Sequence, residues 1–197
     1  MRIVLDWDGT VTEVDGLHLV LEEFGDATIY DEAERRLGRG LTLHEVIAWE
    51  FRSVRAPLAE VVDWVLEHVQ LRDGFAAFAR EHRPLVVSSG FHELIEPVLR
   101  REGLDLEVRA NRLDPRPDGW VALFRNEEPC PVCGEPCKRA DVAGLDGFVY
   151  AGDGFSDRCV ALAASRVFAR DGLARYLEAS GAPFEPFEDF HDLARAL

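Results

Sequence analysis

The sequence predicts an α/β fold, in which a mostly parallel sheet carries helices on both of its faces. Short apolar runs alternate with amphipathic helical segments over most of the chain, as expected for parallel strands joined by crossover helices. One block, 17–70, is helical in pattern throughout, so it is expected to be a helical insertion after the first strand. Two strand-like runs, 106–113 and 120–124, are joined by a loop containing Asp118-Gly119, which predicts a β-hairpin excursion.

The other strands are short apolar runs bounded by charged residues, proline or glycine. They are expected at 3–7, 84–88, 148–151 and 166–169. Helices are expected at 74–82, 91–101, 172–180 and 189–196. The helical insertion divides the chain into a predicted core domain, 1–14 with 72–197, and a predicted cap domain, 15–71.

Helix signals within the insertion support this interpretation. Leu17 and Leu21 lie on one face at helical spacing, Thr42 with Glu45 forms a capping-box pattern, and Pro57 stands at an expected helix start. We expect the cap to move about hinges near its two ends.

The composition excludes several classes of protein. Of the 197 residues 47% are apolar and 30% are charged, which is typical of a globular chain. The formal net charge of −15 repels nucleic-acid phosphates and anionic lipid. No apolar run approaches the roughly 20 residues of a membrane span, and acidic residues interrupt the N-terminus too early for a secretory signal. The sequence therefore predicts a cytoplasmic protein without nucleic-acid or membrane partners.

Chemically useful residues follow three of the predicted strands. Asp6 and Asp8 stand at the end of the first, Ser88-Ser89-Gly90 at the end of the second, and Asp153 with Asp157 just after a third. Each group alone is typical of ordinary turns and helix caps. Together, at one edge of a parallel sheet, they place carboxylates around an anion site, a combination that calls for a hard divalent cation such as Mg²⁺.

A single lysine stands out among the basic residues. Every other basic residue is arginine, and the exception is Lys138. A lysine presents a compact point charge, which suits a phosphate oxygen, although compositional bias alone could leave one lysine in the chain.

These residues resemble the motifs of a known family. Asp6-Trp7-Asp8-Gly9-Thr10 resembles the DxDGT motif of the haloacid dehalogenase superfamily of phosphatases, and Gly152-Asp153-Gly154-Phe155-Ser156-Asp157 resembles its GDGxxD motif. Ser88 matches the second motif of the family and Lys138 matches the third; both lie in the sequence between the two motifs just named. The resemblance implies a Rossmann-like core, and the helical insertion resembles the C1-type cap of the phosphoserine-phosphatase-like branch.

The resemblance also implies a mechanism. Asp6 would be the nucleophile that forms an aspartyl phosphate, Asp8 the general acid and base, and Lys138 a counter-charge. Mg²⁺ would be held by Asp6, Asp8 and Asp153, with Asp157 orienting Lys138 or metal-bound water. The phosphoryl group of a small phosphorylated metabolite would contact Thr10, Ser88, Ser89 and Gly90.

The motifs favour the methionine-salvage type of phosphatase without defining the substrate. The segments 71–75 and 168–171 resemble the methionine-salvage phosphatases, whereas Asn111-Arg112-Leu113 resembles the phosphoserine type. Phosphoserine, phosphocholine and phosphoethanolamine phosphatases are alternatives, as is a non-enzymatic phosphometabolite-binding or redox- or zinc-sensing protein on the same fold. The cap residues expected to face the substrate are Asp15, Trp49, Phe51 and Arg52.

The cysteines form a further pattern. Cys130, Cys133 and Cys137 make a C-x₂-C-x₃-C run, and Cys159 lies apart in the sequence. A C-x₂-C turn suits zinc, but a structural zinc site needs four ligands. Structural Zn²⁺, a disulfide and free thiols all remain open at this stage.

Overall fold

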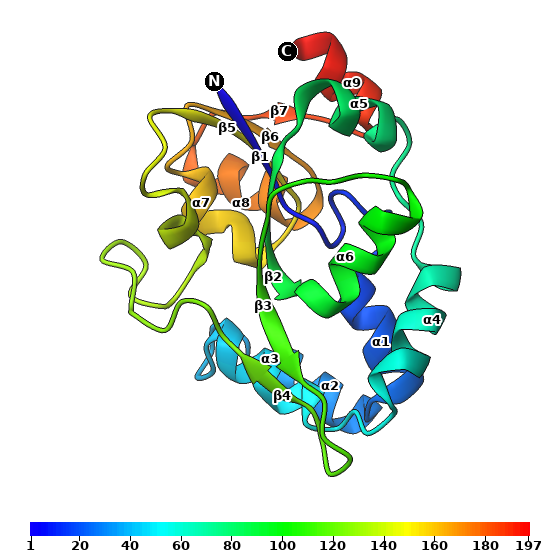
Figure 1. Cartoon of the computed structure of the whole chain (residues 1–197). Helices are drawn as coiled ribbons and strands as arrows, with labels where there is room; N and C mark the ends of the chain where they lie inside the picture. Colours follow the sequence, from blue (N-terminus) through cyan, green and yellow to red (C-terminus); the bar gives the residue numbers. More distant parts are fainter.

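The computed structural model describes residues 1–197 and is built around one seven-stranded sheet with strand order β4-β3-β2-β1-β5-β6-β7 (Figure 1). The strands are β1 (Arg2–Leu5), β2 (Leu85–Phe91), β3 (Val108–Asp114), β4 (Val121–Leu123), β5 (Phe148–Gly152), β6 (Arg166–Ala169) and β7 (Glu185–Pro186). Neighbouring strands pair in parallel except β3 and β4, which form the predicted antiparallel hairpin. The expected α/β fold is confirmed.

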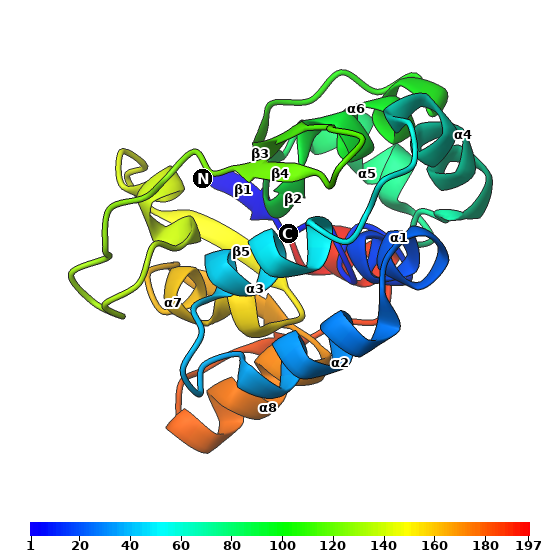
Figure 2. The same ribbon diagram turned by 90° about the horizontal axis from the view of Figure 1, so that it is seen from below.

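Helices cover both faces of the sheet (Figure 2). They are α1 (Gly16–Phe24), α2 (Ala27–Arg36), α3 (Leu43–Phe51), α4 (Leu58–His68), α5 (Phe75–His82), α6 (His92–Arg101), α7 (Arg158–Ala161), α8 (Asp171–Ser180) and α9 (Phe190–Ala196). Short 3₁₀ turns, η1 (Lys138–Val142) and η2 (Phe155–Asp157), complete the chain. Because side chains alternate along a strand, Leu5 packs with α5, α6 and α9, whereas Val4 packs with α7 and α8 on the other face.

The insertion after β1 consists of α1 to α4, and helix α3 begins at the predicted capping box of Thr42 and Glu45. The two ends of the insertion lie side by side. Thr12 and Leu71 form an antiparallel bridge there, and Arg72 N donates to Val11 O over 2.8 Å. The chain thus leaves and rejoins the core at one place, near the boundaries that the sequence predicts for the cap.

The cap is attached to the core more firmly than two hinges would require. One apolar cluster runs without interruption through α1, α3 and α4 of the cap and α5, α6 and α9 of the core. The β3–β4 hairpin adds a third attachment, since the buried indole of Trp120 donates to Ala56 O over 3.0 Å and lies near the Phe51 ring. Movement of the whole cap about its two ends would expose part of this cluster, so the hinge motion stays a prediction.

The cap closes one end of the sheet. In Figure 1, α2 and α3 lie across the end toward which β1, β2 and β3 run, and both termini lie at the opposite end. No helix has both the length and the apolar character needed to cross a membrane.

Candidate active site

The carboxyl ends of β1, β2 and β5 meet beneath the cap, as the sequence predicts. Asp6 and Asp8 follow β1, Ser88 lies within β2, and Asp153 follows β5. The parallel pairing of β1 with both β2 and β5 places these groups at one edge of the sheet. Asp6 is buried, and Asp153 is half-buried.

The loop after β1 is held in a fixed conformation. Gly9 has φ +74°, and a Cβ there would lie 2.4 Å from Asp153 Oδ2, so the turn requires glycine. Arg72, where the cap rejoins the core, donates to the carbonyl oxygens of Gly9 (2.8 Å), Thr10 (2.9 Å) and Thr12 (3.1 Å). These bonds fix the loop that carries Asp8.

Lys138 lies between two aspartates in the interior. Its Nζ is 2.5 Å from Asp6 Oδ1 and 2.7 Å from Asp157 Oδ1, and its side chain is buried. Burial alone lowers the pKa of Lys138, but the charges of Asp157 and Asp6 outweigh it and raise that pKa. The ammonium group is therefore a permanent positive charge beside Asp6.

Both carboxylate oxygens of Asp157 are occupied by donors. Oδ1 accepts from Lys138 and from Tyr150 Oη (2.6 Å), and Oδ2 accepts from the backbone N–H groups of Asp153 and Gly154 (2.9 Å each). Although burial raises the pKa of Asp157, Lys138 and these donors outweigh it and lower that pKa. Asp157 is thus an ionised group that holds Lys138 in place.

The remaining carboxylates carry an excess of negative charge. Burial, with repulsion from Asp157, raises the pKa of Asp6 well above its usual range and that of Asp153 to about 7. Burial and the nearby Asp15 raise the pKa of Asp8 to about 8. One lysine does not balance these groups, so a bound cation would stabilise their ionised forms.

The donor set fits a hard divalent cation. Ligand atoms of Asp6, Asp153 and Asp157 lie within 4.8 Å of one another. Hydrogen bonds and the ion pair use Oδ1 of Asp6 and Oδ1 of Asp153, which leaves one oxygen of each for a metal. The residues present therefore fit Mg²⁺.

Ser88, Ser89 and Gly90 interrupt the pairing of β2 with β3. The register shifts between Val87 and Phe91, so the backbone of these three residues departs from regular pairing with β3. The buried Ser88 Oγ accepts from Gly90 N (2.8 Å) and lies 3.4 Å from Asp8 Oδ2, while Ser89 and Gly90 border the space under the cap.

Asn111 holds the backbone of this segment in place. Nothing in the sequence indicates this role, because Asn111 stands out there only as part of Asn111-Arg112-Leu113. Its Nδ2 donates to Ser89 O over 2.8 Å, and its Oδ1 accepts from Arg125 Nη1 over 3.0 Å. Asn111 is buried and lies on β3, so the neighbouring strand fixes the position of the Ser89 backbone.

Thr10 occupies a different place from the one expected. Its side chain is fully buried, and its Oγ1 donates to Asp153 Oδ1 over 2.9 Å. The hydroxyl therefore bonds Asp153 in this structure, whereas the sequence motif places Thr10 at the phosphate.

A cavity of about 220 Å³ lies between the cap and the three strand ends. Asp15 borders it, as expected, but Trp49, Phe51 and Arg52 do not. Phe51 faces inward and contacts the Phe91 ring, and Arg36 lies over the Trp49 ring. This corrects the expected face of α3, since helical spacing places Val46, Ile47 and Glu50 on the cavity side.

The roof of the cavity is acidic and apolar. Asp15, Glu34 and Glu50 border it together with His18 and Tyr30, and neither lysine nor arginine does. Glu50 is only 5% exposed, and its Oε1 has no hydrogen-bond partner. Burial, with repulsion from Glu34 and Asp15, raises the pKa of Glu50 to about 8. A buried carboxyl with one unpartnered oxygen thus borders the space where a substrate would lie.

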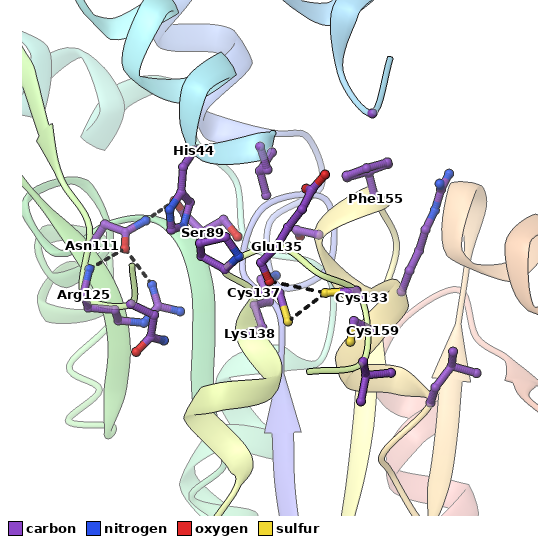
Figure 3. A pocket seen from close by; sticks show the side chains of 18 of the residues that line it. His44, Ser89, Asn111, Arg125, Cys133, Glu135, Cys137, Lys138, Phe155 and Cys159 are labelled. Atoms are coloured by element: carbon purple, nitrogen blue, oxygen red, sulfur yellow. Dashed lines mark hydrogen bonds between the residues drawn. The ribbon is translucent and has the colours of Figure 1, made fainter. Parts of the chain in front are cut away.

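A second cavity, of about 430 Å³, adjoins the first at Ser89 and Phe155. Figure 3 shows Asn111 and Arg125 on one side of it, and Cys133, Cys137 and Cys159 on the other. The cysteines therefore lie next to the site, and Cys159 lies among them.

The chain belongs to the haloacid dehalogenase-like hydrolase family, whose pattern matches residues 3–162. Its curated relatives are named as phosphatases, several similar solved structures are phosphoserine phosphatases, and the chain is an enzyme of this phosphatase class. Two relatives are 2-hydroxy-3-keto-5-methylthiopentenyl-1-phosphate phosphatases from strains of Bacillus cereus, 26% and 27% identical, each matched over 100% of this chain and 95% of its own length.

The fold is similar to those of phosphoserine phosphatases. A substrate-bound phosphoserine phosphatase matches with a TM-score of 0.71 at 16% identity, covering 100% of this chain and 98% of that one. The phosphoserine phosphatase from T. onnurineus matches with a TM-score of 0.69 at 16% identity, covering 98% and 91%.

Proposed function

We propose that this protein is a Mg²⁺-dependent phosphomonoester hydrolase that acts on a small phosphorylated metabolite through an aspartyl-phosphate intermediate. The observation that carries this proposal is the convergence of Asp6, Asp8 and Asp153 with the buried Lys138 ammonium at the cavity beneath the cap. A core of 1–14 and 72–197 supplies these groups, and the segment 15–71 covers them.

Asp6 is the proposed nucleophile. Its carboxylate attacks phosphorus, and the contacts of Oδ1 with Lys138 Nζ and Trp7 N fix the orientation of the side chain. The attack forms the Asp6–phosphorus bond and breaks the bond between phosphorus and the leaving oxygen. Lys138 offsets negative charge that develops on the transferring phosphoryl group, and Asp157 keeps Lys138 in position.

Asp8 is the proposed general acid and base. It protonates the leaving oxygen, and its carboxylate then removes a proton from the water that cleaves the intermediate. Ser88 Oγ lies 3.4 Å from Asp8 Oδ2, and Gly16 N donates to Asp8 Oδ1 over 3.0 Å, so both oxygens have a defined orientation. The backbone N–H groups beside Ser89 would hold the phosphoryl oxygens.

The carboxylates of Asp6 and Asp153 and the backbone carbonyl of Asp8 would hold Mg²⁺. Bound there, the ion supplies positive charge that offsets the repulsion between phosphate and carboxylates.

The cavity favours a leaving group with hydrogen-bond donors and an apolar part. Leu21 and Ile47 provide apolar surface, while Glu50 Oε1 offers an acceptor. The substrate named for the Bacillus relatives carries a hydroxyl and a methylthio group, a combination that matches this lining. We therefore favour a methionine-salvage type of substrate.

A phosphorylated amine is the second candidate. Asp15 and Glu34 would attract an ammonium group, as in phosphoethanolamine or phosphocholine, and its charge would favour the ionised form of Glu50 as a further partner. Phosphoserine is disfavoured, because neither lysine nor arginine borders the cavity to pair with its carboxylate.

A panel of phosphorylated metabolites assayed with Mg²⁺ tests this proposal, with Asp6→Asn as the matched variant. We expect kcat/KM to be highest for a carboxylate-free substrate and turnover to vanish in Asp6→Asn, which keeps the side-chain shape. Glu50→Gln separates the two candidates, since about a tenfold rise in KM is expected for an amine and little change for a neutral hydroxyl compound. Near-normal turnover by Asp6→Asn, or phosphoserine as the best substrate, would contradict the proposal.

A further inference from the structure

The tertiary structure brings together all four cysteines of the chain. Cys130, Cys133 and Cys137 come from the segment before η1, and Cys159 comes from α7. Their sulfur atoms all lie within 4.8 Å of one another. The distance from Cys130 Sγ to Cys159 Sγ is 3.8 Å, and that from Cys133 Sγ to Cys137 Sγ is 3.5 Å.

These separations match the edges of a metal tetrahedron. With Zn–S bonds of about 2.3 Å, tetrahedral geometry places the sulfur atoms about 3.8 Å apart. All four cysteines are free thiols in the structure, so no disulfide consumes them. Four soft sulfur ligands gathered this closely are typical of a zinc site.

The backbone around Cys130 has the conformation of a metal-binding turn. Val132 N points at Cys130 Sγ over 3.4 Å, and Gly134 N donates to Cys130 O over 2.8 Å. Gly134 has φ +81°, which allows the chain to fold back after Cys133. On the other side of the cluster, Arg139 Nη1 lies 3.6 Å from Cys159 Sγ. These donors would stabilise thiolate charge.

We propose that Cys130, Cys133, Cys137 and Cys159 form a structural Zn²⁺ site, separate from the proposed Mg²⁺ site. Binding replaces the four S–H bonds with four Zn–S bonds and releases four protons to solvent, without any change of oxidation state. The fourth ligand, which the sequence run lacks, is supplied by α7.

The position of the cluster indicates that the zinc would stabilise the active site. The segment 124–137, between β4 and η1, contains no helix or strand. Cys137 immediately precedes Lys138, and Cys159 lies two residues after Asp157. Zinc would therefore join the two segments whose ends form the 2.7 Å ion pair between Lys138 and Asp157. In this way the metal acts as a positioning element for Lys138.

Metal analysis tests the site without any substrate, so its outcome is independent of the proposed function. The protein is passed through a desalting column with EDTA, and zinc, iron and reactive thiols are then counted per chain. We expect about one tightly held zinc, no iron and four protected thiols. Cys133→Ser and Cys159→Ser should retain about tenfold less zinc, whereas Val132→Ser, an exposed residue between two ligands, should retain it fully.

Cobalt substitution covers the case in which the cysteine variants fail to fold. Co²⁺ added to zinc-free wild-type protein should give the absorption bands of a tetrahedral cobalt–thiolate centre. Zinc-free protein with four freely reactive thiols and no such bands would overturn the proposal. A mass lower by four hydrogens, bound iron, or full zinc retention by Cys159→Ser would also overturn it.

The effect of zinc on the position of Lys138 is tested separately, by steady-state kinetics. Zinc-free protein resupplied with Mg²⁺ should hydrolyse p-nitrophenyl phosphate with kcat about tenfold lower and KM little changed, because Lys138 loses its fixed position. Equal kcat with and without zinc would overturn this role.

Discussion

Replacement of Glu50 by glutamine should stabilise the protein at alkaline pH. The carboxyl group of Glu50 is 5% exposed, lies near Glu34 and Asp15, and has one oxygen without a hydrogen-bond partner. The folded structure raises its pKa from 4.5 to about 8. The ionised group is therefore destabilising, and Glu50→Gln removes that charge while keeping the shape.

The sign and size follow from the linkage between proton binding and folding. Between pH 4.5 and 8 the folded state keeps a proton on Glu50 that the unfolded state has lost, so wild-type stability falls as the pH rises. Each unit of pKa difference corresponds to about 1.4 kcal/mol, and water in the cavity screens part of the full effect. We expect Glu50→Gln to add about 2 kcal/mol to the free energy of unfolding at pH 8 and almost nothing at pH 4.5.

Urea denaturation of wild type and variant from pH 4.5 to 8 measures this difference, with Glu67→Gln, an exposed carboxyl in the cap, as the control. The control should show no pH-dependent difference from wild type. A stabilisation by Glu50→Gln that is equal at all pH values, or a destabilisation at pH 8, would refute the reasoning.

Three further predictions concern groups that hold the site together. Arg72→Ala should lower the free energy of unfolding by about 2–3 kcal/mol in urea, because it leaves several loop carbonyls without their donor; a loss below 0.5 kcal/mol would contradict this. Asp153→Asn should weaken Mg²⁺ binding, followed by calorimetry, by at least about tenfold, and unchanged affinity would exclude Asp153 as a ligand. Asn111→Ala should weaken inhibition by inorganic phosphate about tenfold, because the backbone at Ser89 loses its support, whereas the neighbouring exposed Arg112→Ala should not.

Local patterns in the sequence predicted the sheet and its helices, because apolar period and capping signals act over a few residues. The 3–7 and 84–88 runs became β1 and β2, and Thr42 with Glu45 begins α3. The two-residue strand β7 carries too few residues to show any period, so the sequence did not predict it.

Residue spacing along the chain also predicted the meeting of Asp6, Asp8 and Asp153, because parallel strands necessarily deliver their carboxyl ends to one edge. The orientation of the cap was not predictable in this way. Whether Phe51 or Glu50 faces the site depends on which face of α3 packs against Phe91 and Trp120, residues far away in the sequence.

The sequence by itself determined the fold class, the helical insertion and the acidic strand ends, since each is encoded by neighbouring residues. Only the tertiary structure decided that Thr10 donates a hydrogen bond to Asp153 and that Asn111 donates one to the Ser89 carbonyl. It also decided that Cys159 lies beside the other three cysteines. Such contacts join residues that lie tens to more than a hundred positions apart, and packing and hydrogen-bond satisfaction over the whole molecule select them. No local pattern carries that information.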